Sequence, residues 1–145
     1  VIQDRISGET DWQFQSYPLS SGTHILRWRY VKDGSVTTGS NCGWLDKVEF
    51  IPPLYVSASG CGGLTPCYST IQSALNVAVD GSVIKVAQGT YNEAPTKSTT
   101  GTVTISGGWN TTFASQTGTT EMYSPIATGG AVLKVQPNIK LIAPQ

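Results

Sequence analysis

The sequence is poor in charged residues. Asp, Glu, Lys and Arg make up 12% of its 145 residues, against roughly 25% in an average soluble domain, and the formal net charge is zero. A neutral chain does not present the basic surface that nucleic acids and anionic membranes require, so neither is expected as a partner. No apolar run is long enough to cross a bilayer, and we therefore predict no membrane span. Because Val1 opens directly on polar sequence, we expect any export signal to have been removed or to lie outside this chain.

Histidine and cysteine are also scarce. The one histidine and three cysteines do not form a recognisable zinc-ligand spacing. Cys61 and Cys67 enclose the Gly-rich run GCGGLTPC, which is long and flexible enough to close a small disulfide. We predict this bond, and with it a secreted or cell-surface location; the alternative is two free thiols in a reducing compartment. Cys42 is left over and is interpreted as a small buried hydrophobe.

Glycine, serine, threonine and asparagine replace the missing charge, and they favour turns and β-structure over exposed helices. Apolar and polar residues alternate over residues 24–31, and this period of two predicts a strand. Trp28 and Tyr30 would face a core, whereas Arg27 and Arg29 would face water or a partner.

A second strand is predicted over residues 44–51. It ends at Pro52 and Pro53, because proline lacks the N–H group that a sheet ladder needs. We place a domain boundary here, which divides the chain into residues 1–52 and 53–145.

The first segment resembles a known group of sandwich domains. The run W-x-F-x-x-Y-x-L-x-x-G-x-H-x-L-x-W-x-Y-x-K-D, followed by G-x-x-x-G-W-L-D-x-V-x-F, is similar to the last strands of the carbohydrate-binding-like jelly-roll sandwiches of bacterial surface proteins. MAM-type and cleaved-adhesin-type modules belong to this group. A whole jelly roll needs about eight strands, so we expect residues 1–52 to be only its C-terminal part. The matching residues are Trp12, Leu19, Gly22, His24, Leu26, Trp28, Tyr30, Lys32, Asp33, Gly39, Trp44, Leu45, Asp46, Val48 and Phe50.

The second segment begins with a short amphipathic helix, predicted over Ser69–Ala78. Ser69 and Gln72 have the spacing of a capping box, and Ile71, Ala74, Leu75 and Ala78 recur at helical spacing. We interpret this helix as a plug that covers the open end of a parallel β-solenoid. The strands predicted after it are Val83–Ala87, Thr102–Ser106, Ala131–Val135 and Ile139–Ile142.

This second segment resembles the start of the right-handed parallel β-helix of pectate-lyase-like proteins. The residues that carry the resemblance are YSTIQSALNVAVDGSVIKVAQGTYNE and, after it, VTISGGWNTTF. The fold class expected for the whole chain is therefore all-β: a partial antiparallel sandwich followed by the cap and first rungs of a parallel β-helix. The resemblance implies a fold and does not assign an activity, because that fold carries lyases, hydrolases and adhesins.

No catalytic constellation stands out. Polysaccharide lyases of the resembling family use clustered carboxylates for calcium, whereas Glu93 is isolated and is interpreted as a solvated or turn-capping residue. A glycosidase needs two carboxylates across a cleft, and Asp46 and Glu49 fall on opposite faces of their predicted strand. His24 is interpreted as structural.

The candidate binding residues are aromatic and basic. Trp12, Trp109, Arg27 and Arg29 are the candidates for contacts with a ligand, the tryptophans by stacking on sugar rings, whereas Trp28 and Trp44 are interpreted as core residues. No cofactor is expected. Asp33 and Asp46 supply oxygen ligands of the kind that a structural calcium ion takes; the alternative is a turn cap and a strand-end hydrogen bond.

Three functions follow from this reading. The first is a non-catalytic extracellular module for glycan binding, adhesion or assembly. The second is part of a polysaccharide lyase or glycoside hydrolase. The third is a fibre-forming structural subunit that self-associates through open β-edges, which are exposed if both domains are incomplete.

Overall fold

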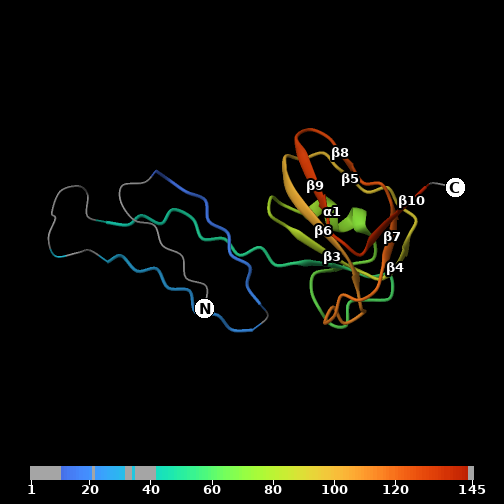
Figure 1. The fold of residues 1–145 in the computed structure, drawn as a ribbon, viewed down its shortest axis with the longest axis horizontal. Helices are drawn as coiled ribbons and strands as arrows, with labels where there is room; N and C mark the ends of the chain where they lie inside the picture. The colour runs from blue at the N-terminus through green and yellow to red at the C-terminus, as the bar shows by residue number, and fades with distance from the viewer. Residues whose placement is uncertain (1–10, 21, 32–33, 35–41, 144–145) are drawn as a thin grey trace. The chain divides into compact units, whose positions relative to one another are not determined.

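The computed structural model of the protein describes residues 11–20, 22–31, 34 and 42–143. The chain divides into two compact units, Val1–Lys47 and Val48–Gln145, which are described separately here (Figure 1). The predicted domain boundary after residue 52 lies near this division and stays a prediction.

In the first unit, no described residue belongs to a helix or a strand. The strands predicted over residues 24–31 and 44–51 are therefore not formed. Trp28 and Trp44 are 58% and 76% exposed, so the expectation that they are core residues is wrong, and the same holds for Tyr30. Alternating apolar residues become buried only where another layer covers their face, and the described part of this unit provides none. The antiparallel sandwich stays a prediction.

The second unit winds its strands into successive turns (Figure 1). The first turn contains β3 (Val83–Ala87), β4 (Gly89–Tyr91) and β5 (Thr96–Lys97). The second contains β6 (Gly101–Trp109), β7 (Thr120–Tyr123) and β8 (Ile126–Ala127). The third contains β9 (Ala131–Val135) and β10 (Ile139–Ile142). Before the first turn come β1 (Leu54–Val56), β2 (Cys67–Tyr68) and α1 (Ile71–Val77).

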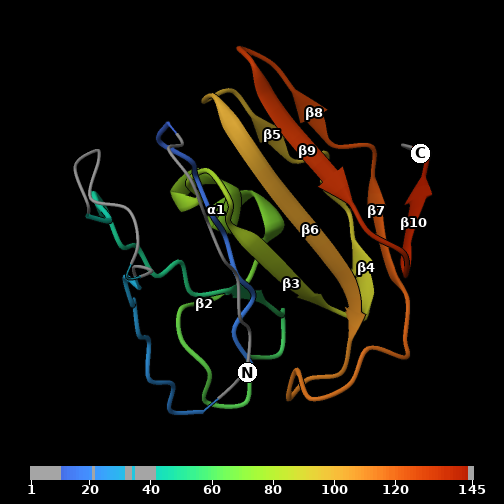
Figure 2. The same ribbon diagram turned by 60° about the vertical axis from the view of Figure 1, so that its left-hand side comes forward.

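Equivalent strands of successive turns pair in parallel and form three sheets. Sheet A has the order β2-β1-β3-β6-β9, sheet B the order β10-β7-β4, and sheet C consists of β5 and β8. Every pairing between these strands is parallel, and Figure 2 shows β3, β6 and β9 side by side. The all-β class with parallel sheets and one short helix is confirmed. The right hand of the solenoid stays a prediction.

The core lies between the sheets, and the strand register keeps its rows of apolar side chains aligned. Ile84 pairs with Ile105 across sheet A, and Tyr91 pairs with Met122 across sheet B. Ile84, Ile105 and Met122 are fully buried, and burying a side chain of this size contributes roughly 1.5–3 kcal/mol. Stacking of equivalent residues from successive turns therefore builds continuous rows of apolar side chains in the core.

The glycine pair Gly107 and Gly108 lies where β6 passes close to the following turns. A Cβ on Gly107 would lie 2.5 Å from the Ile139 side chain, and one on Gly108 would meet the carbonyl oxygen of Gly118. Gly108 also has φ +76, a conformation that glycine adopts most readily, and its N–H donates to Thr120 Oγ1 at 2.8 Å. Close backbone approach therefore accounts for the Gly-Gly pair in the sequence.

Helix α1 begins one position later than the predicted capping box requires. Thr70 is the N-cap, and its Oγ1 accepts from the Ser73 N–H at 3.1 Å, so the prediction that Ser69 and Gln72 form the capping box is wrong. The Gln72 amide instead pairs with Thr96 of β5: its Oε1 accepts from the Thr96 N–H (2.7 Å), and its Nε2 donates to the Thr96 carbonyl (3.0 Å). The Gln72 side chain thus forms the hydrogen bonds that a neighbouring strand would otherwise make with the edge strand β5 of sheet C.

The apolar stripe of α1 joins the solenoid core. Ile71, Ala74 and Leu75 are buried and pack in one cluster with Val56 and Ile84, and α1 contacts β1, β2, β3 and β5. It lies at the side of the first turn, where β4 and β5 are the edge strands of their sheets. The helix is Ile71–Val77 instead of the predicted Ser69–Ala78, and its role as a plug of the solenoid end stays a prediction.

Candidate functional site

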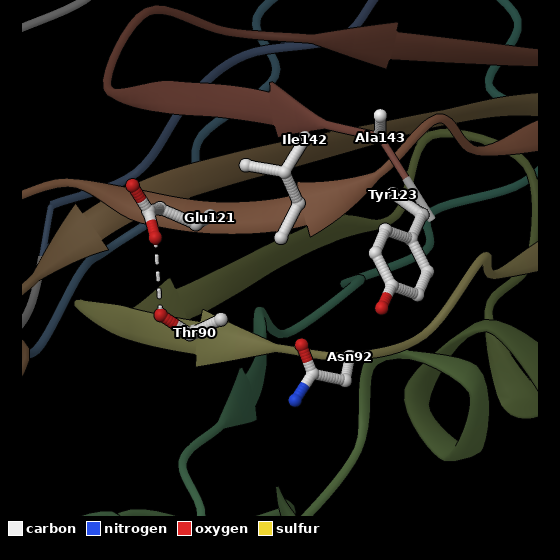
Figure 3. Close-up of a pocket in the computed structure, with 6 residues that line it drawn as sticks. All are labelled: Thr90, Asn92, Glu121, Tyr123, Ile142 and Ala143. Carbon is white, nitrogen blue, oxygen red and sulfur yellow. Dashed lines mark hydrogen bonds between the residues drawn. The ribbon is translucent and has the colours of Figure 1, made fainter. Parts of the chain in front are cut away.

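A pocket of about 520 Å³ lies on the outer surface of sheet B (Figure 3). Strands β4, β7 and β10 stack here in register, with Thr90 beside Glu121 and Glu121 beside Lys140. Side chains two positions apart on a strand share a face, so a second outer row follows this one. The residues that line the pocket are Thr90, Asn92, Glu121, Tyr123, Ile142 and Ala143.

The charged group of the pocket is Glu121, and both of its carboxylate oxygens are bound. Oε1 accepts from Lys140 Nζ at 2.7 Å, and Oε2 accepts from the Thr90 hydroxyl at 3.1 Å. The hydrogen bond from Lys140 holds the pKa of Glu121 below its ordinary value of 4.5, and Thr90 and the charge of Lys140 act in the same direction. Glu121 is therefore ionised at neutral pH and suits the role of hydrogen-bond acceptor better than that of general acid.

Asn92 and Tyr123 complete the polar lining. Figure 3 shows the Tyr123 hydroxyl and the Asn92 side chain on the same side of the pocket, with Ile142 between Tyr123 and Glu121. Neither polar side-chain group has a hydrogen-bond partner within the part of the chain that the structure describes. The pocket therefore combines free hydrogen-bonding groups, an aromatic ring and an apolar wall.

A second hollow of about 300 Å³ lies beside Tyr91 and Ser57 and shares Thr90 with the first. Tyr91 is buried, and its hydroxyl donates to the Val56 carbonyl at 3.4 Å. Burial raises the pKa of Tyr91 to about 12, and the charge of Glu93 acts in the same direction. Since Tyr91 belongs to the buried core cluster and its hydroxyl binds the backbone of β1, we assign Tyr91 a structural role.

The predicted ligand residues do not line either hollow. Trp12, Arg27 and Arg29 belong to the first unit, where their side chains are exposed. Trp109 belongs to the second unit; its indole N–H donates to Ser106 Oγ at 3.1 Å, and Lys85 Nζ lies 4.1 Å from its ring centroid. Because Lys85 occupies one face of the ring, that face is not open for stacking on a sugar.

The predicted calcium ligands are only partly described. Asp33 lies outside the described residues, and Asp46 has an exposed side chain. Across the described ranges, no group of three or more His, Cys, Asp and Glu side chains gathers as a metal site would require. The calcium site therefore stays a prediction.

The predicted disulfide between Cys61 and Cys67 is confirmed, with the two Cα atoms 5.9 Å apart. Cys61 is buried and packs with Ala87, the last residue of β3, and with Phe113, in the loop after β6, which ties this loop to the first and second turns. Cys42 is exposed, so its interpretation as a buried hydrophobe is wrong. The described residues around Cys42 form no core in which it can be buried.

Glu93 has a more specific role than the solvated or turn-capping one expected from the sequence. Its Oε1 accepts from the Ile71 N–H at 2.8 Å, and its Oε2 accepts from the Gln72 N–H at 3.0 Å. Two orphan amides at the start of α1 are thereby satisfied by a residue more than 20 positions away in the sequence. Glu93 is a structural carboxylate in this arrangement.

Sequence reasoning missed the residues of the sheet B pocket. Gly89 pairs with Thr120, and Thr120 pairs with Ile139, so successive turns differ in length. Residues that stack in a row on the outer face recur at a fixed spacing in the sequence only when all turns have the same length. Here the spacing varies, so the row is not visible in the sequence. The Gly-Thr-Tyr-Asn run that contains Thr90 and Asn92 is the available signal, and by itself it does not indicate which residues of the next turn lie beside it.

Comparison with protein-family models, with curated proteins and with solved structures found no match. The resemblances to jelly-roll modules and to the pectate-lyase-like β-helix therefore stay predictions. Within the described part of the chain, no helix is long and apolar enough to cross a bilayer.

Proposed function

We propose that this chain is a non-catalytic extracellular β module that binds glycans, and that the sheet B pocket is its ligand site. The observation that carries this proposal is the pairing of unpartnered Asn92 and Tyr123 groups with the apolar side chain of Ile142 in one pocket. A sugar ring has polar hydroxyls on its rim and apolar C–H faces, so it needs such a mixed lining. Tyrosine suits this task because its ring is apolar and its hydroxyl is polar.

The rival function, a polysaccharide lyase or glycoside hydrolase, needs carboxylates or a base that are free to act. Glu93 is engaged by the backbone of α1, and Glu121 is engaged by Lys140 and Thr90. Hydrolysis at a glycosidic bond needs an acid and a second carboxylate on the two sides of the substrate. The engagement of both acids supports binding over catalysis at this pocket.

The proposed location is outside the cell or on its surface. The Cys61–Cys67 disulfide supports this location, because disulfides form and persist in oxidising compartments.

A glycan-binding panel tests the proposal directly. The full chain would be applied to immobilised neutral and acidic oligosaccharides, beside the variants Tyr123→Ala and Trp12→Ala. We expect binding to fall by about fivefold or more in Tyr123→Ala, because the lost ring contact is worth roughly 1 kcal/mol or more. Trp12→Ala is the matched control, since it removes an exposed aromatic side chain of the first unit. A wild-type chain that binds no glycan, or a Tyr123→Ala variant that binds normally, would contradict the proposal.

Assembly through β-edges is a second candidate, and the third turn supports it. Strands β8, β9 and β10 are edge strands of their sheets. The exposed apolar residues on these strands are Val132 and Val135 of β9 and Leu141 of β10. Unpaired edges with apolar side chains favour pairing with another chain. Sedimentation velocity should then show a mass that rises with concentration and falls in Leu141→Asp. Val79→Asp, on an equally exposed residue after α1, is the control, and a constant monomer mass would exclude this candidate.

A further inference from the structure

We infer that the sheet B pocket selects uncharged saccharides and discriminates against uronates. The inference rests on the proposed function and adds the class of ligand. It is carried by the position of the Glu121 carboxylate, which lines the pocket, whereas its partner Lys140 does not. A sugar carboxylate that enters the pocket would therefore meet a like charge at its wall.

The ion pair weakens this repulsion without removing it. Lys140 donates to Glu121 Oε1 at 2.7 Å, and its side chain is 64% exposed, so water screens much of its charge. The other oxygen, Oε2, accepts from the neutral Thr90 hydroxyl at 3.1 Å. The local charge at this oxygen is negative, and no cationic side chain of the described residues lines the pocket.

The hydrogen-bonding groups of the pocket also fit a neutral ring. Asn92 offers an N–H donor and a carbonyl acceptor, Tyr123 offers a hydroxyl, and Glu121 retains acceptor capacity. Each sugar hydroxyl both donates and accepts, so it can satisfy these groups in either direction. A carboxylate only accepts, and it cannot satisfy the acceptor groups of Glu121 and Asn92. The apolar side chains of Ile142 and Ala143 can cover a C–H face of the same ring.

A matched pair of ligands isolates the charge. Oligogalacturonides and their methyl esters share a sugar backbone and differ in the charge of the carboxyl group. Binding of each to the full chain would be measured by NMR titration at neutral pH. We expect the ester to bind about tenfold more tightly than the acid, because one unfavourable charge contact in a solvated site has about this effect. The difference should narrow when the salt concentration is raised.

The variant Glu121→Gln provides the second measurement. The amide keeps the shape and one acceptor oxygen of the side chain, removes its charge and leaves Lys140 unpaired, so the affinity ratio of ester to acid should fall to one or below. Circular dichroism would confirm that the variant folds. Equal or tighter binding of the acid by the wild-type chain would overturn the inference, and so would an unchanged ratio in Glu121→Gln; neither outcome affects the proposed function. If no oligosaccharide of either kind, nor any neutral one, binds the wild-type chain, the proposed function and this inference both fail.

Discussion

Glu93 and Lys97 hold opposite ends of α1 from a single short segment. The Glu93 carboxylate accepts from the first two amides of the helix, and Lys97 Nζ donates to the carbonyls of Leu75 (3.1 Å) and Ala78 (2.6 Å). A negative charge at the N-terminus and a positive charge at the C-terminus both complement the helix dipole. A seven-residue helix is too short to be stable alone. The hydrogen bonds of Glu93 and Lys97 and the packing of α1 against the core therefore stabilise it.

Glu93 and Lys97 together form a clamp on α1, and replacing either residue should destabilise the second unit. Glu93→Gln leaves one backbone amide less well bound, and Lys97→Met removes the buried Nζ donor from the carbonyls of Ala78 and Leu75, of which Leu75 keeps, among the donors that the structure describes, only the Ala78 N–H at 3.3 Å. Each variant should lower the free energy of unfolding by about 1–3 kcal/mol. Urea denaturation followed by circular dichroism measures the change. Lys134→Met, on an exposed position of β9, is the control, and equal stability in all variants would show that the clamp contributes nothing.

The plug role of α1 can be tested on two residues of that helix. Leu75 is fully buried, whereas Val77 is 52% exposed. Leu75→Ala should lower the free energy of unfolding by about 2–5 kcal/mol, because it removes buried contacts and leaves a cavity. Val77→Ala should have little effect. If thermal unfolding gave the same midpoint for the two variants, α1 would not cover the core.

The ion pair on sheet B should appear in a pH titration. Because Lys140 and Thr90 stabilise the ionised form, the pKa of Glu121 is depressed. Its contribution to stability is therefore present above the ordinary pKa of 4.5 and is lost as the pH falls through the lower pKa of the folded chain. Carboxyl carbon NMR should show a midpoint below 4.5 for Glu121. Lys140→Ala should move it upward, and no movement would show that the pair does not form in solution.

Tyr91 should respond at the opposite end of the pH scale. Burial and, to a smaller extent, Glu93 raise its pKa to about 12, from an ordinary value of 10.0. Stability from the neutral phenol is fully present below pH 10 and is lost as the pH rises toward 12. The difference in phenolate absorbance between the wild-type chain and Tyr91→Phe isolates this group. A midpoint near 10 would mean that Tyr91 is not buried.

Three strands could be predicted because their apolar content is local. Val83–Ala87, Ala131–Val135 and Ile139–Ile142 coincide with β3, β9 and β10, and each is a short run rich in branched apolar residues between turn residues. Strand β7 (Thr120–Tyr123) was missed because Met122 is its only large apolar residue on the core side. Its place is set by pairing with β4 and β10, which no local pattern reveals.

The candidate site was harder to predict than the fold. Its polar residues lie in β4, directly after β4, and in β7. Only the register of sheet B brings them together. The tryptophans were predicted as ligand residues because aromatic rings are common in sugar sites, yet the Trp109 side chain is bound by Ser106 and Lys85. The type of a residue indicates whether its side chain can bind a sugar, but only the stacking of the turns places Asn92 and Tyr123 in one pocket.

The measurement that tests the central claim most directly is a map of NMR chemical-shift changes during titration with a neutral oligosaccharide. The account predicts that the largest changes occur at Asn92, Glu121 and Tyr123, with saturation of the shifts as the ligand is added. The Trp12 indole signal of the first unit should not move. Changes centred on Trp12 or Trp109, or the absence of saturable changes on sheet B for every neutral oligosaccharide tested, would contradict it.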